Sequence, residues 1–209
     1  MCSSKNLNKE YWDGALNQYY TTLVQFTEYS FERMLKAKEI ILDNNAPIEM
    51  KAKTCANIVH DVFEGMAREY FGNKEETMAG DFNGVFGILL KGKCFIRFNK
   101  LNENFSISNA QSDQRDFFVN QTKLDFFEDD IVYLNLGYRV DQFWTNIEGI
   151  HIVCWNGSFE WEIDIKYQVN DLEQTSIDFT DNPNEIQKPR TNVKRDNNSK
   201  ENDKLEKHG

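Results

Sequence analysis

His60, Glu64 and Arg68 are the first candidate in this sequence for residues that act together in chemistry. They recur at every fourth position, so they share one face if the segment is an α-helix. An imidazole beside a carboxylate can act as a general base or as a metal ligand. The same spacing is typical of a polar helix face with i,i+4 pairing, and the sequence holds no HExxH motif. His60 and Glu64 are therefore candidate catalytic residues, and a purely structural role is the alternative.

Asp164 and Lys166 are the second candidate pair, with Glu162 and Asp141 as accompanying acids. Metal-dependent nucleases of the restriction-endonuclease type place an acid and an Asp/Glu-x-Lys triplet on neighbouring strands. The carboxylates hold a divalent cation there, and the lysine steadies the attacking water. The alternative is that these residues form only the polar face of an amphipathic strand.

A basic segment suggests contact with nucleic acid. Residues 84–100 contain four bases and no acid, and the bases are Lys91, Lys93, Arg97 and Lys100. On a strand, Lys93, Phe95, Arg97 and Asn99 share one face, where basic residues beside an exposed aromatic ring could hold a phosphate backbone or stack a base. Residues 101–130 contain seven acids and two bases, so pairing of the basic segment with this acidic loop is the alternative.

The cysteines and histidines do not have the spacing of a metal site. Cys2, Cys55, Cys94 and Cys154 lie far apart, and no CxxC motif is present. Walker, GxSxG and GxGxxG motifs are also missing from the sequence. We therefore expect no cofactor and no metal. The last three cysteines are predicted to be small buried hydrophobic side chains in a reducing, cytoplasmic compartment.

Composition limits the class of protein. The chain has 209 residues, 40% of them hydrophobic, and a net charge of −10. This length supports one compact core with a tail rather than two full domains. The acidic total disfavours a general nucleic-acid coat protein. No run approaches the roughly 20 apolar residues that span a bilayer, and the first residues lack the apolar core of a signal peptide, so we expect no membrane association.

Residues 8–72 are predicted to form a helical hairpin. Apolar residues recur at helical spacing from Trp12 to Leu42, and a break follows at Pro47. A second apolar stripe runs from Cys55 to Tyr70, where Gly72 provides a C-terminal stop.

Residues 84–167 are predicted to form an antiparallel sheet of about five strands. The strands are expected at 84–90, 93–99, 131–140, 147–155 and 158–166. Asn156-Gly157 is a strong hairpin signal. The last strand alternates, with Phe159, Trp161, Ile163 and Ile165 on one face, so one side of the sheet is expected to be buried and the other wet. The sequence thus predicts an α+β fold, with the helical hairpin packed on the sheet in a single domain of residues 1–167.

Residues 168–209 are predicted to be a disordered charged tail, because they contain few core-forming residues. Residues 168–187 have five acids and no base, whereas residues 188–209 have seven bases and four acids. The basic end could touch nucleic acid or an acidic partner, or could only aid solubility.

Four segments resemble an uncharacterised family found in bacteria and mobile elements. They are TCANIVHD at 54–61, GVFGILLKGK at 84–93, LGYRVD at 136–141 and HIVCWNG at 151–157. The family is associated with genes for helix-turn-helix regulators and ImmA/IrrE-type peptidases. The resemblance covers roughly residues 50–166 and brings no assigned active site. It implies a setting of phage–host conflict, toxin–antitoxin control or stress regulation.

Aromatic residues on the first helix suggest a protein interface. Tyr11, Trp12, Tyr19, Tyr20 and Tyr29 exceed what one sheet face normally buries, and Tyr and Trp suit interfaces. Covering the edges of the sheet is the alternative. We therefore expect a non-enzymatic interaction or regulatory protein with a protein partner, such as an antitoxin, an inhibitor or an accessory subunit of a defence system. The alternatives are a metal-dependent nuclease, or a nucleic-acid sensor that uses the 91–100 hairpin or the basic end of the tail.

Overall fold

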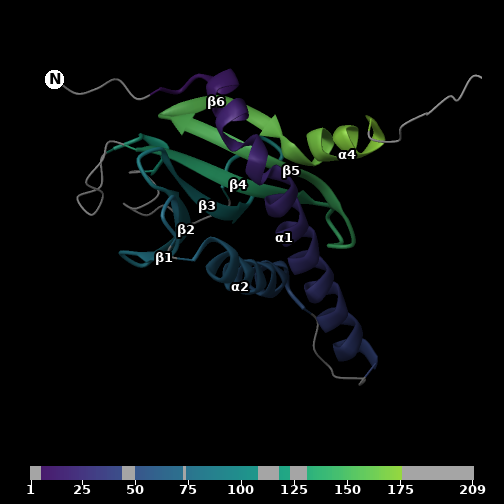
Figure 1. Ribbon diagram of the computed structural model, residues 1–209. Coiled ribbons are helices and arrows are strands. Elements are labelled where there is room, and N and C mark those ends of the chain that lie inside the picture. The colour runs from purple at the N-terminus through teal and green to yellow at the C-terminus, as the bar shows by residue number, and fades with distance from the viewer. Residues whose placement is uncertain (1–5, 44–49, 73, 108–117, 123–130, 176–209) are drawn as a thin grey trace, which may run out of the picture. The chain divides into compact units, whose positions relative to one another are not determined.

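The structure is a computed structural model that describes residues 6–43, 50–72, 74–107, 118–122 and 131–175. Two long helices pack on one face of a six-stranded, mostly antiparallel sheet (Figure 1). The α+β fold and the packing of the N-terminal helices on the sheet, both predicted from the sequence, are confirmed.

The two long helices match the predicted hairpin closely. Helix α1 spans Lys9–Asp43 and helix α2 spans Ala52–Phe71. Each buries one apolar stripe, because apolar residues recur every three or four positions. Helix α2 ends at Gly72, whose φ of 37° favours glycine and whose N–H donates to the Arg68 carbonyl.

The strands follow the chain in order across the sheet. They are β1 (Thr77–Phe82), β2 (Val85–Leu90), β3 (Cys94–Lys100), β4 (Val132–Val140), β5 (Ile147–Asn156) and β6 (Ser158–Asp164). Strand β1 was not predicted, since its alanine, glycine and aspartate have low strand propensity. Strands β3 and β4 are parallel, and the other neighbouring strands are antiparallel. Side-chain patterns report which face is buried but not strand direction, so an entirely antiparallel sheet was expected.

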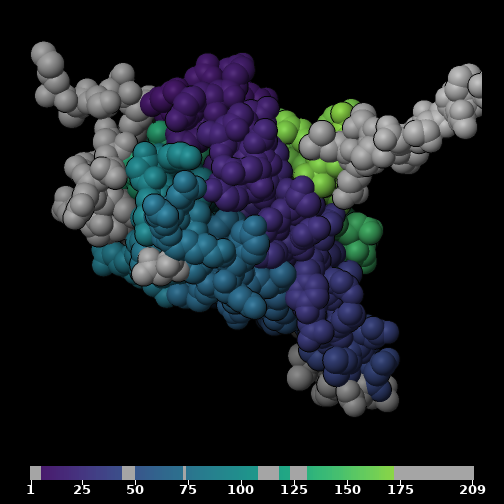
Figure 2. All heavy atoms as spheres, in the orientation of Figure 1, coloured from purple at the N-terminus to yellow at the C-terminus, as the bar shows by residue number. Residues whose placement is uncertain are grey.

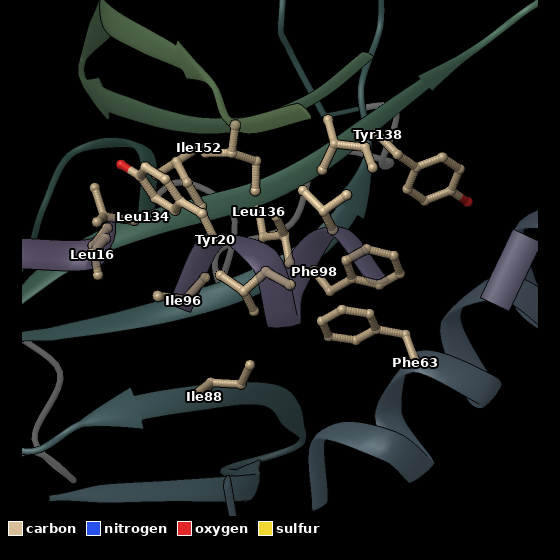
Figure 3. Packing of buried hydrophobic residues seen from close by; sticks show 14 of the residues in the cluster. Leu16, Tyr20, Phe63, Ile88, Ile96, Phe98, Leu134, Leu136, Tyr138 and Ile152 are labelled. Atoms are coloured by element: carbon tan, nitrogen blue, oxygen red, sulfur yellow. The ribbon is translucent and has the colours of Figure 1, made fainter. Parts of the chain in front are cut away.

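Both helices cover the same face of the sheet. Helix α1 contacts β5 and β6, whereas α2 contacts β1, β2 and β3. Figure 2 shows α1 and α2 side by side over this face. The core between the two layers includes Leu16 and Phe63 from the helices and Ile96, Leu134 and Ile152 from the strands (Figure 3). Burying such side chains contributes about 1.5–3 kcal/mol each, so this layer is the main source of stability.

The opposite face of the sheet is also covered, so the prediction that it is wet was wrong for the central strands. Phe95, Tyr133 and Val153 are buried there, beneath residues 101–107 and Phe118. Period-two alternation shows which residues share a face. It does not show that a connecting segment folds back over that face.

The chain after β6 differs from the prediction. The strand ends at Asp164, and helix α4 (Ile165–Thr175) follows, so the first residues assigned to the tail, 168–175, are helical. The Asp164 side chain accepts a hydrogen bond from the Tyr167 N–H at 2.9 Å, as an N-cap does. The sequence lacks a glycine or proline that marks this change. Residues 176–209, with the basic end of the tail, lie outside the described residues.

Phe159 was predicted to point into the core but is 42% exposed. Strand β6 has one extra residue opposite the step from Cys154 to Trp155, which is a β-bulge. Phe159 therefore lies opposite Trp155, and it stacks on Phe105 outside the core between helices and sheet.

Candidate anion-binding cleft

A cleft opens where strands β2 and β3 part. Their pairing covers three positions and ends at Ile88 and Ile96, whereas β2 stays paired with β1 to Val85, and β3 with β4 to Lys100. The resulting space, the β2–β3 cleft, has a volume of about 820 Å³. Its lining comprises Ala52, Lys53, Ala56, Asn57, His60, Glu64, Asp81, Gly84, Val85, Phe86, Arg97, Phe98, Asn99, Lys100, Tyr138 and Trp144.

Gly87 marks the point at which the two strands separate. A Cβ atom on this residue would lie 2.3 Å from Cζ of Phe95 and 2.8 Å from the carbonyl oxygen of Ile96. No side chain fits so close to a ring and a backbone group. The glycine therefore lets β3 approach β2 at the last paired positions before the cleft begins.

On one side of the cleft, two carboxylates are bound to an arginine. The Arg68 guanidinium donates to Oε1 of Glu64 at 2.5 Å and to Oδ2 of Asp81 at 2.6 Å. The hydrogen bonds that Arg68 donates to Glu64 and Asp81 raise the pKa of Arg68. We call Glu64, Arg68 and Asp81 the ion-paired group. The positive charge of Arg68 therefore balances part of the negative charge of Glu64 and Asp81.

The predicted pair His60 and Glu64 lies in this part of the cleft. Nδ1 of His60 is 3.8 Å from Oε2 of Glu64, which is longer than a hydrogen bond. The imidazole instead lies against the rings of Phe86 and Phe98, each with its centroid 6.1 Å away. Because Glu64 binds Arg68, it does not orient His60 as a catalytic carboxylate would.

On the other side, three cations have no carboxylate partner among the described residues. We call Lys53, Arg97 and Lys100 the basic group. Burial lowers the pKa of Arg97 to about 10, and its guanidinium carbon lies 4.4 Å from the centre of the Phe118 ring, so this side chain borders the opening between β2 and β3 from the face of the sheet opposite the helices. Nζ of Lys100 lies 5.6 Å from the Trp144 ring. Charge withdrawn from water without a counter-charge is unfavourable, so an anion in the cleft would stabilise this side.

The four predicted nucleic-acid-binding residues do not form one surface. Arg97 and Lys100 line the cleft, whereas Lys91 and Lys93 are exposed at the β2–β3 turn, at the other end of the strands. Phe95, expected as an exposed stacking ring, is fully buried, because the covering segments pack against this face of the sheet.

The acidic loop of residues 101–130, the alternative partner of these bases, lies largely outside the described residues. Of its seven acids, Glu103 alone falls among the described residues, and no ion pair joins it to the four bases.

Tyr138 adds an unsatisfied hydroxyl to the cleft. The residue is 1% exposed, and its hydroxyl makes no hydrogen bond to a described residue. Burial raises its pKa, so the group stays protonated. In Figure 3 the hydroxyl points away from Leu136 and Ile152. Since Tyr138 lines the cleft, its hydroxyl is available to a bound molecule.

Trp144 is held at the cleft by a constrained loop between β4 and β5. Its φ of 55° is uncommon for a bulky residue and costs conformational energy. The loop is fixed by hydrogen bonds from Thr145 to the Asp141 carboxylate and from Nζ of Lys38 to the Phe143 carbonyl. The bonds from Thr145 lower the pKa of Asp141, and together with the Lys38 bond they position the indole. Sequence reasoning missed Trp144, Tyr138 and Lys53, because no local spacing relates them.

The predicted nuclease residues are separated. Asp164 caps α4, and Nζ of Lys166 lies 3.2 Å from Glu28 on α1. Glu162 binds His151 instead. Within the described part of the chain, no three histidine, cysteine or acidic side chains gather closely enough to hold a metal ion.

His151 is a titratable residue that sequence reasoning passed over. It is 5% exposed, and its Nδ1 lies 3.0 Å from Oε2 of Glu162 on the neighbouring strand. Its Nε2 is buried without a partner against Gly149, and the Phe105 ring lies 5.0 Å away. Only strand register brings His151 and Glu162 together. The closed position of Nε2 leaves no room for a substrate.

The predicted interface aromatics on α1 divide into three groups: buried, half-buried and exposed. Trp12 and Tyr20 lie in the core between helices and sheet, and Tyr20 donates to Asp13 at 2.8 Å. Tyr19 is half-buried beside Phe71. Tyr11 and Tyr29 are exposed and available to a partner. The other large exposed hydrophobic side chains among the described residues are Ile40, Leu42, Tyr70, Phe143, Phe159 and Tyr167.

The prediction that the last three cysteines are small buried side chains is confirmed. Cys55, Cys94 and Cys154 are buried and free of disulfides. Burial raises the pKa of all three thiols, that of Cys154 to about 12. They therefore remain protonated, weakly nucleophilic core side chains.

Comparison with known proteins adds no relative. No family model, no curated protein and no solved structure matches this chain. The family resemblance drawn from the four segments therefore stays a prediction. Among the described residues, no helix has both the length and the apolar character needed to cross a bilayer.

Proposed function

We propose that this protein is a non-enzymatic regulatory binding protein, and that the β2–β3 cleft is its site for an anionic ligand. The main support is the basic group, in which Lys53, Arg97 and Lys100 line one cleft without a carboxylate partner among the described residues. The acids nearest to them in the lining, Glu64 and Asp81, are already bound to Arg68.

Arg97 supplies the energetic argument. An arginine withdrawn from water is ordinarily paired with an acid, since an unpaired charge is costly to bury. Here burial depresses the pKa of Arg97, and its neighbour within the described residues is the Phe118 ring rather than a carboxylate. An anion in the cleft would supply the missing counter-charge, so this residue costs stability in the empty protein and favours the bound state.

Binding has more support than catalysis. Among the described residues that line the cleft there is no serine, threonine or cysteine that could serve as a nucleophile. His60 is the one side chain there suited to general-base work, and the carboxylate beside it is held by Arg68. The alternative of a nuclease at Asp164 and Lys166 would require cleavage that disappears when either is replaced by alanine.

Calorimetric titration with inorganic pyrophosphate tests the proposal. We expect saturable binding at one site per chain, weakened at least tenfold in Arg97→Met, with the pyrophosphate recovered intact by phosphorus NMR. Lys91→Met, which removes an exposed lysine outside the cleft, is the matched control and should bind like the wild type. The proposal would be overturned if neither pyrophosphate nor a nucleotide bound to the protein. It would also be overturned if the protein hydrolysed the pyrophosphate.

The protein partner and the biological setting remain predictions. Tyr11 and Tyr29 are the exposed members of the aromatic set on α1 and could contribute to such a contact. A native pull-down is expected to recover a stoichiometric partner that is lost in the Tyr11→Ser, Tyr29→Ser double variant. The role in phage–host conflict or toxin–antitoxin control, and the cytoplasmic location, rest on the sequence alone.

A further inference from the structure

We infer that the ligand of the β2–β3 cleft is a nucleotide unit, with its phosphate at the basic group and its base beside Tyr138 and Trp144. This inference rests on the proposed function and names the ligand class. The unit is either a free mononucleotide or one nucleotide of a single strand, since both present the same base and phosphate chemistry.

The phosphate position is set by side-chain and backbone charge together. Lys53 and Lys100 both line the cleft, and Ala52 and Lys53 are the first two residues of α2. The preceding Lys51 makes no side-chain cap, so the first N–H groups of this 20-residue helix are not satisfied by a capping side chain. Helix N-termini favour anions, and here the effect adds to Lys53 and Lys100, while Arg97 borders the cleft from the opposite face of the sheet.

The base position is set by aromatic rings. Tyr138 stacks on Phe98 with centroids 5.3 Å apart, and Trp144 meets Tyr138 edge-on at 6.4 Å. Aromatic side chains bind bases of any sequence through their faces, at about 1–3 kcal/mol per base. The constrained loop places Trp144 near Tyr138 and near Lys100. One ligand that carries an aromatic ring and an anionic group could therefore contact the indole and the lysine together.

Polar groups at this end can recognise the edge of a base. The Tyr138 hydroxyl has no partner among the described residues, and Asn57 also lines the cleft. Nδ2 of Asn99 donates to Asn135 at 3.3 Å, which leaves its carbonyl oxygen as an acceptor. Donors and acceptors beside aromatic faces are what a nucleobase requires, whereas a purely anionic ligand needs neither.

The size of the cleft agrees with this assignment. Its volume of about 820 Å³ lies within the range of about 300–1,000 Å³ for small-molecule sites. A simple phosphate or sulfate would occupy only the basic end and leave the aromatic end empty. A nucleotide has a second part, a planar base, that reaches Trp144.

Competitive calorimetry with matched probes tests the inference. The probes are adenosine 5′-monophosphate, uridine 5′-monophosphate, adenosine, ribose 5-phosphate, pyrophosphate and a ten-residue thymidine oligonucleotide. We expect a mononucleotide to bind at least tenfold more tightly than ribose 5-phosphate or adenosine, because only the nucleotide uses both ends. Tighter binding of the oligonucleotide, with the same dependence on Trp144, would identify a strand as the source of the unit.

Variants at the aromatic end separate this inference from the proposed function. Trp144→Ala should weaken nucleotide binding about tenfold and leave pyrophosphate binding within twofold, and Trp144→Phe should restore most of the nucleotide affinity. Phe143→Ala, at the exposed neighbouring aromatic, is the matched control and should change neither. Circular dichroism of each variant checks that the fold is kept.

Two outcomes would contradict these expectations. Equal affinity for nucleotides, ribose 5-phosphate and pyrophosphate, unaffected by Trp144→Ala, would refute the nucleotide assignment while leaving an anion site in place. Absence of binding by every probe would refute the anion site as well.

Discussion

The ion-paired group and the basic group line the same cleft but satisfy their charges differently. In the first, Arg68 is half-exposed and binds two carboxylates at hydrogen-bond distance. In the second, Arg97 is more deeply buried, yet has no acid partner among the described residues. A charge network that serves only the fold is expected to show the reverse, with its pairs placed where water is scarce.

This difference separates structural charge from charge kept for a ligand. Replacing Arg68 removes existing interactions, so the fold should lose stability. Replacing Arg97 removes a desolvation cost and, at the same time, the ligand's counter-charge. The two arginines therefore make a matched pair, in which the same substitution to methionine is predicted to have opposite effects.

The largest predicted difference is in ligand affinity. Arg97→Met should weaken pyrophosphate or nucleotide binding about 30-fold, which corresponds to about 2 kcal/mol, because a desolvated charge pair is lost. Arg68→Met should weaken it about threefold or less, through the two carboxylates left unbalanced near the cleft. Calorimetric titration of both variants measures the ratio of their dissociation constants. Equal losses would show that the two groups do not differ in role.

The second difference is in folding stability, where the signs are opposite. Arg97→Met should raise the free energy of unfolding by about 1 kcal/mol, since the burial cost exceeds the contact with the Phe118 ring. Arg68→Met should lower it by about 0.5–1 kcal/mol, the usual contribution of exposed ion pairs. Urea unfolding of the wild type and both variants measures these changes. Destabilisation by both substitutions would assign Arg97 a structural role.

The sequence identified the parts of this fold whose signals are local. Periodicity placed both long helices and five of the strands within a few residues, because burial of one face imposes it. Strand β1, the bulge at Phe159, the parallel pair and helix α4 depend on tertiary contacts, so no local pattern reported them.

The cleft, too, depends on tertiary contacts that the local sequence pattern does not report. Arg97 and Lys100 were found as bases, and His60 and Glu64 as a helix face. Their meeting in one cleft depends on where β2 and β3 separate. Spacing along the chain contains no signal for that point except Gly87.

A third prediction concerns the lysines of the basic group. Lys53→Met and Lys100→Met should each weaken ligand binding about threefold, less than Arg97→Met, because exposed charges interact through water. Raising the salt from 0.05 to 0.5 M should weaken wild-type binding, and the salt dependence should be smaller in each lysine variant. Lys93→Met, outside the cleft, should keep the wild-type salt dependence. An unchanged salt dependence in both cleft variants would remove these lysines from the site.

The smallest predicted effect is a dependence on pH. Burial lowers the pKa of Arg97 to about 10, so below that pH the folded protein holds a buried charge. Above it, the folded state releases a proton that the unfolded state keeps, and stability rises relative to Arg97→Met. The stability difference between the two proteins should shrink by about 0.8 kcal/mol between pH 8 and pH 10.5. A difference that stays constant or widens would show that Arg97 is not desolvated.

The central claim is that Arg97 is retained at a cost to the fold because it binds an anionic ligand. Melting temperatures of the wild type and Arg97→Met, each with and without adenosine 5′-monophosphate at saturating concentration for the wild type, test it most directly. We expect the variant alone to melt about 2–4 °C above the wild type, and the nucleotide to raise the melting temperature of the wild type by clearly more than that of the variant. A variant that melts below the wild type, or that gains as much from the nucleotide, would contradict the claim.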